Sequence, residues 1–184
     1  MNPLLNKQAK MQRLSKILHH VMLIGAFSVA ILFILQLILI FILAYHPQTL
    51  TGTPFMTDCK MGIFELKLAT SRQAIGVLIF TLLNSAVAFP IVVLISQIFK
   101  DISHSHSPFT NKQTRRLKAI SLLMLSMTLA VPVLHWLLTV IFLPDVKARL
   151  FLDLTGLIFA AVFRCLALIF DHGSELQQQA DETL

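Results

Sequence analysis

Four long apolar segments constrain the fold more than any other feature of this sequence. They cover residues 21–45, 74–99, 119–143 and 150–170, and each has at least the roughly 20 residues that an α-helix needs to cross a bilayer. Hydrophobic residues make up 56% of the chain and charged residues only 13%, which excludes an ordinary water-soluble domain. Barrel strands would be shorter and would alternate apolar with polar residues. We therefore predict an all-α membrane protein, a single domain over residues 1–184 built as a four-transmembrane-helix bundle.

Lysine and arginine are unevenly distributed between the two sides that four spans define. The N-terminal segment and the second loop together carry nine, whereas the first and third loops carry five. Cytoplasmic loops of membrane proteins carry the excess of these residues. We therefore predict a multi-pass protein of a bacterial inner membrane, with both termini in the cytoplasm and with residues 171–184 as an acidic cytoplasmic tail.

The first loop, residues 46–73, lies outside the cytoplasm in this orientation. Within it, Glu65 and Lys67 alternate with Phe64, Leu66 and Leu68. A period of two residues is typical of a strand. The sequence leaves two interpretations open, a small β-hairpin or a segment that lies on the membrane surface.

The second loop contains the segment SPFTNKQTRRLKAI, in which Thr110 precedes Gln113 by three residues. This spacing is a capping box, so we expect a helix to begin near Thr110 and to run on into the third span. The first turns of this helix are basic because of Lys112, Arg115, Arg116 and Lys118. Basic residues next to a span contact anionic lipid, or they form a docking surface for an acidic segment.

The chain ends with FDHGSELQQQADETL, which has no lysine or arginine. Gly173 permits a break or a kink after the fourth span. An anionic bilayer would repel the acidic side chains, so we expect the tail to lie against the basic second-loop helix or against a basic soluble partner. The tail residues to which we assign partner binding are Glu175, Gln177, Asp181 and Glu182.

Two segments, IFKDISHSHSPFTNKQTRRLKAI and IFDHGSELQQQADETL, resemble a bacterial family called domain of unknown function 2975. The family consists of small four-span membrane proteins that are often encoded beside a small helix-turn-helix DNA-binding regulator. The resemblance therefore implies a membrane partner that senses a signal and holds or releases that regulator. The HSHS insert at residues 104–107 departs from the family pattern. The matching positions are Phe99, Lys100, Pro108, Phe109, Thr110, Asn111, Arg116, Leu117, Phe170, Gly173, Glu175, Leu176, Gln177, Asp181, Glu182 and Thr183.

Three polar side chains fall inside the predicted spans, at Asn84, His135 and Arg164. Hydrogen bonds between helices account for the first two. Arg164 either extends toward the cytoplasmic headgroups or faces the bundle interior and binds an anionic group. A small transporter or a lipophile-binding protein would use the same residue types, and this is the alternative function.

The sequence contains no Ser-His-Asp arrangement, no phosphate-binding glycine loop and no paired catalytic carboxylates. We therefore expect no enzyme, no cofactor and no metal, and no direct contact with nucleic acid. The expected partners are the lipid bilayer and a soluble DNA-binding regulator, which binds the cytoplasmic face at Thr110, Lys112, Arg115, Arg116 and the tail. A homo-oligomer, a bacteriocin-type immunity protein and a subunit of a larger membrane complex stay open.

Overall fold

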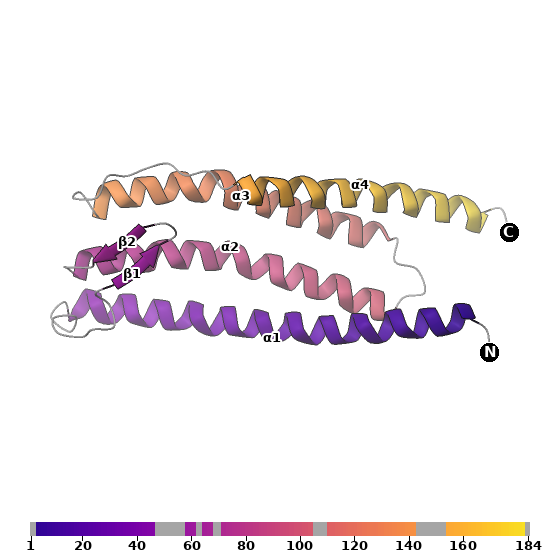
Figure 1. Ribbon diagram of the computed structural model, residues 1–184, viewed down its shortest axis with the longest axis horizontal. Helices are drawn as coiled ribbons and strands as arrows, with labels where there is room; N and C mark the ends of the chain where they lie inside the picture. Colours follow the sequence, from indigo (N-terminus) through magenta and orange to yellow (C-terminus); the bar gives the residue numbers. More distant parts are fainter. Residues whose placement is uncertain are drawn as a thin grey trace.

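The computed structural model describes residues 3–46, 58–61, 64–67, 71–104, 110–142 and 154–182 (Figure 1). The helices are α1 (Pro3–Tyr45), α2 (Ser71–His104), α3 (Asn111–Phe142) and α4 (Leu154–Glu182). Each is long and apolar enough to cross a membrane. Each also covers most of one predicted span, which confirms the multi-pass, predominantly helical architecture.

The helices follow one another in space as they do in the chain. α1 packs along α2, α2 along α3, and α3 along α4, whereas α1 and α4 do not touch within the described ranges. The bundle is therefore an open row rather than a closed barrel of helices. α3 and α4 are antiparallel neighbours, as the short third loop predicts, because Asn111 and Lys118 of α3 contact Ser174 and Asp171 of α4, respectively.

One end of the row carries the start of α1, the end of α2, the start of α3 and the end of α4 (Figure 1). We call it the terminal end. The opposite end carries two four-residue strands, β1 (Asp58–Met61) and β2 (Phe64–Lys67), which pair antiparallel with Asp58 opposite Lys67. They lie in the segment for which the sequence left a hairpin and a surface-lying segment open. A two-stranded ribbon of this size is marginally stable by itself, so the helices define the fold.

The main hydrophobic core joins α2, α3 and α4. Its buried members are Ile91 and Ile98 of α2, Leu117 and Ile120 of α3, and Ala167 of α4. Many other apolar side chains are exposed, and on α1 they cover the part of the helix that does not pack against α2. An apolar outer surface of this kind is unfavourable in water but suits the hydrocarbon of a bilayer, since lipid tails are as apolar as leucine.

The start of α3 agrees with the capping-box prediction. The backbone N–H of Gln113 donates to Thr110 Oγ1 at 3.4 Å and to the Thr110 carbonyl at 2.9 Å. The reciprocal bond of the box is missing, because the Gln113 side-chain amide is fully buried without a hydrogen-bonding partner among the described residues. Thr110 therefore caps the start of α3 with only one of the two hydrogen bonds of a capping box.

The fourth helix does not break at Gly173. α4 continues through this residue to Glu182, so most of the predicted tail is a helical extension of the span. We call residues 171–182 the acidic extension.

Candidate functional site

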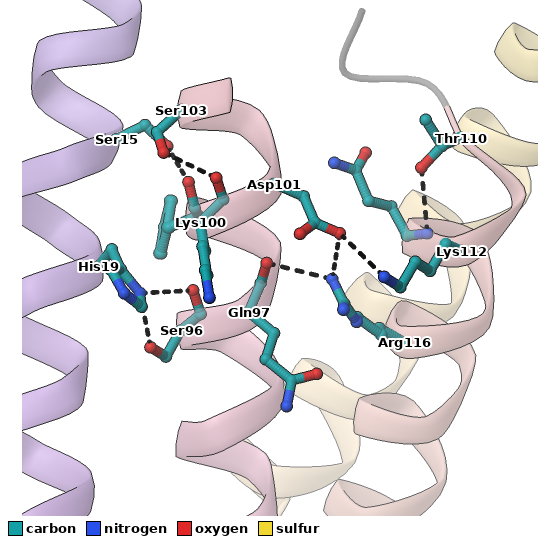
Figure 2. Close-up of polar contacts among 12 residues, drawn as sticks. Ser15, His19, Ser96, Gln97, Lys100, Asp101, Ser103, Thr110, Lys112 and Arg116 are labelled. Carbon is teal, nitrogen blue, oxygen red and sulfur yellow. Dashed lines mark hydrogen bonds and ion pairs between the residues drawn. The ribbon is translucent and has the colours of Figure 1, made fainter. Parts of the chain in front are cut away.

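The polar side chains of the terminal end are built around Asp101, near the end of α2. Arg116 of α3 lies 2.7 Å from the Asp101 carboxylate and also donates to the Gln97 carbonyl at 3.1 Å (Figure 2). Lys112, one helical turn earlier on α3, places its Nζ 4.0 Å from the same carboxylate. These contacts form an ion-pair cluster that joins the last turn of α2 to the first turns of α3. The cluster comprises Asp101, Lys112 and Arg116.

A second set of polar contacts joins α1 to the last turns of α2. Ser15 Oγ donates to the Phe99 carbonyl at 2.6 Å. His19 Nδ1 lies 3.0 Å from the Ser96 carbonyl oxygen and 2.9 Å from the Ser96 hydroxyl oxygen (Figure 2). Since Ser15 and His19 are four residues apart, they lie on one face of α1. They fix the register of α1 against α2 at the terminal end.

The third set joins α3 to the start of the acidic extension. Lys118 Nζ donates to Asp171 Oδ2 at 2.9 Å, and Ser174 Oγ donates to Asn111 Oδ1 at 3.2 Å. Asn111 is the first residue of α3, and the two helices are antiparallel. The eight residues 175–182 therefore extend beyond α3, by about 12 Å at the helical rise. Figure 1 shows the end of α4 projecting past the start of α3.

The projecting part of the extension keeps its carboxylates at the surface. The Glu175 side chain is 70% exposed and lies 3.8 Å from His172 of its own helix. Glu182 is exposed and accepts a hydrogen bond from Gln178 Nε2 at 3.1 Å, again within the helix. Neither carboxylate contacts a basic residue of α3 within the described structure. On α3, Lys112 and Arg116 contact Asp101 instead, and Lys118 contacts Asp171 at the start of the extension.

The predicted partner-binding residues therefore have different environments. Lys112, Arg115, Glu175 and Glu182 are exposed, and Gln177 is half-buried on the extension. Arg116 is held in the contact with α2, where only 12% of its side chain is exposed, and Thr110 caps α3. The side chain of Asp181 lies outside the described residues. Apart from the Lys118–Asp171 ion pair, the exposed basic residues of α3 and the exposed carboxylates of α4 at the terminal end do not contact each other within the described structure.

The three polar residues of the spans do not form one site. Asn84 Nδ2 donates to the Phe80 carbonyl of its own helix at 3.0 Å. The His135 ring packs against the Phe80 ring with 4.2 Å between centroids. Arg164 is exposed on α4 and lines a groove that neither of the other two residues reaches. A transport site that combines all three side chains is therefore not supported by their positions.

Four residues that make these contacts were not predicted from the sequence: Asp101, Ser15, His19 and Ser96. One signal could have identified Asp101, because it is the only acidic residue between Glu65 and Asp145. A basic helix that packs against a neighbouring helix would take the nearest carboxylate as a counter-ion. No comparable signal marks the serines, since most serines in helices bond to their own backbone.

The terminal end offers charges and exposed side chains for docking, and its inward polar groups hold the helices together. Comparison of the sequence with protein-family models, curated proteins and solved structures gives no match. The resemblance to domain of unknown function 2975 therefore stays a prediction.

Proposed function

We propose that this chain is a regulatory protein of a bacterial inner membrane whose cytoplasmic face binds a small helix-turn-helix transcription regulator. The observation that carries the proposal is the acidic extension. Residues 175–182 project beyond α3 as a continuous helix, and the carboxylates of Glu175 and Glu182 have no cationic partner on α3. A helical acidic segment that projects from the end of the bundle is suited to binding a basic soluble protein.

Charge and apolar contact have separate parts in this binding. DNA-binding regulators are basic on the face that contacts DNA, so complementary potentials would steer one to the extension. Exposed ion pairs contribute only about 0–1 kcal/mol each. Leu176, 53% exposed on the extension, supplies an apolar anchor, since a fully buried leucine contributes about 1.5–3 kcal/mol. A regulator bound through its DNA face would be held away from DNA until a signal releases it.

The proposal requires the terminal end to lie in the cytoplasm. The excess of lysine and arginine on that side supports this orientation. A protease site placed after Leu184 tests it. We expect cleavage in inside-out membrane vesicles and protection in intact cells, and the reverse pattern would exclude the proposal.

The family resemblance implies a helix-turn-helix regulator encoded beside the gene, and co-purification of that regulator with the full membrane protein tests binding. Truncation after Asp171 removes residues 172–184 but keeps the Lys118–Asp171 ion pair. The double variant Glu175→Gln/Glu182→Gln removes two charges and keeps the helix. Glu65→Gln, which removes a carboxylate at the opposite end, is the matched control. We expect loss of the regulator after truncation, weaker and less salt-dependent recovery from the double variant, and full recovery from the control. Equal recovery from all four proteins would refute the function.

A further inference from the structure

A groove with a volume of about 470 Å³ runs between α3 and α4, separate from the terminal ion-pair cluster. Most of its lining is apolar, yet it contains two basic side chains. The α3 side consists of Lys118, Ser121, Leu122 and Leu125, and the α4 side of Leu157, Ala160, Ala161 and Arg164.

The groove has a basic end and an apolar end. Lys118 and Leu125 are seven residues apart on α3, and Arg164 and Leu157 are seven residues apart on α4. Seven residues are about two helical turns, or about 10 Å. Because α3 and α4 are antiparallel, both cations lie toward the terminal end and both leucines lie toward the middle of the membrane-spanning region. The groove is therefore polarised in the same sense as a membrane lipid.

Arg164 is exposed and has no hydrogen-bonding or ionic partner among the described residues. Its neighbours on α4 include the exposed apolar residues Ile158, Val162 and Leu168. A guanidinium on an apolar span is costly unless an anion or water accepts its hydrogen bonds. An anion bound at the basic end of the groove would therefore stabilise the Arg164 guanidinium.

The charges at this end define the anion. Lys118 already donates to Asp171, and an ammonium group has two further donors. Together, Lys118, Arg164 and Asp171 carry one net positive charge, which one phosphodiester group would neutralise. A zwitterionic headgroup would bring its own cation close to Lys118 and Arg164 and would be disfavoured.

We propose that the groove is a binding site for one phospholipid with an anionic headgroup. The phosphate is bound by Arg164 and Lys118, and an acyl chain lies along Leu122, Leu125 and Leu157. Basic pockets between transmembrane helices near the headgroup level bind anionic lipids in the same way. The headgroup anchors at the terminal side of the groove, and the acyl chain covers the α3–α4 seam, where Ser121 Oγ donates to the Ala160 carbonyl at 2.8 Å.

The full-length protein in detergent is titrated with phosphatidylglycerol, with phosphatidylcholine and with inorganic phosphate, and bound lipid is counted by native mass spectrometry. Arg164→Gln removes the unpaired cation, and Ala161→Trp fills the groove without a change in charge. Arg13→Gln removes an exposed arginine of α1 and is the matched control. We expect one phosphatidylglycerol per chain, affinity about fivefold lower for Arg164→Gln, loss of the bound lipid in Ala161→Trp, and no change in the control.

Three outcomes would overturn the proposal. Equal retention of phosphatidylcholine would show that the headgroup charge is not recognised. Stabilisation of the protein by inorganic phosphate alone, to the same extent as by the lipid, would identify a free anion as the ligand. Unchanged lipid binding in both groove variants, each with the melting temperature of the unmodified protein, would place the lipid elsewhere.

Discussion

The guanidinium of Arg116 on α3 lies 2.7 Å from the carboxylate of Asp101 on α2, with 12% of the Arg116 side chain exposed. Lys112 approaches the same carboxylate to 4.0 Å with 71% of its side chain exposed. Asp101 therefore binds one shielded and one solvated cation. The shielded pair holds α2 and α3 together, and the solvated one contributes little.

The first prediction concerns this difference. Asp101→Asn leaves the Arg116 charge without a counter-ion, and we expect it to lower the free energy of unfolding by about 1–3 kcal/mol. Lys112→Gln should change it by less than about 0.5 kcal/mol. Thermal unfolding of both variants in detergent provides the measurement. Equal effects of the two substitutions would show that Arg116 is solvated in the membrane-bound protein.

The contact between α1 and α2 gives the second prediction. Ser15 is buried, and Ser15→Ala removes its hydrogen bond to the Phe99 carbonyl, at an expected cost of about 0.5–1.5 kcal/mol. Among the described residues, Ser28 bonds only to the Gly25 carbonyl of its own helix, so Ser28→Ala should have almost no effect. The melting temperatures of the two variants distinguish these cases. A larger loss from Ser28→Ala would contradict the register of α1 against α2.

The third prediction depends on how closely two helices approach at a glycine. A Cβ atom on Gly76 would lie 2.7 Å from Phe142 Cβ, whereas one on Gly25 would lie 3.8 Å from Val92 Cγ1. We expect Gly76→Ala to destabilise the protein by about 1–3 kcal/mol, because the end of α3 must move away from α2. Gly25→Ala should be tolerated. The comparison is made by thermal unfolding, and a neutral Gly76→Ala would show that the α2–α3 contact opens easily at this end.

The fourth prediction tests the continuity of α4. Gly173→Pro removes a backbone donor and brings the proline ring against the carbonyl of Ile169, which costs about 3 kcal/mol or more inside a helix. Alanine at the same position favours the helix by about 1 kcal/mol over glycine. We expect limited proteolysis to cut the acidic extension faster in Gly173→Pro and more slowly in Gly173→Ala, with the melting temperature of the spans unchanged by the proline. The same rate of cleavage in both variants would mean that the extension is not a continuation of the span.

The number and approximate limits of the spans could be predicted from the sequence because hydropathy is a local property. A window of about 20 residues either carries enough apolar side chains to remain in lipid or does not. The start of α3 at Thr110 was predictable for the same reason, since a cap depends on residues within one turn. The charges on residues 171–184 were also evident, whereas their helical continuity was not, because glycine both permits a break and tolerates a helix.

Only the tertiary structure decided which polar residues meet. The sequence offers two acidic partners for the basic turns of α3, namely Asp101 and the extension. In the structure, different basic residues contact each of them. Arg116 takes Asp101, and Lys118 takes Asp171. This choice depends on how each helix is rotated about its axis and how far it is shifted along its neighbour. Those two quantities are set by the packing of Ile98, Leu117, Ile120 and Ala167 between helices, and no local pattern in the sequence encodes them.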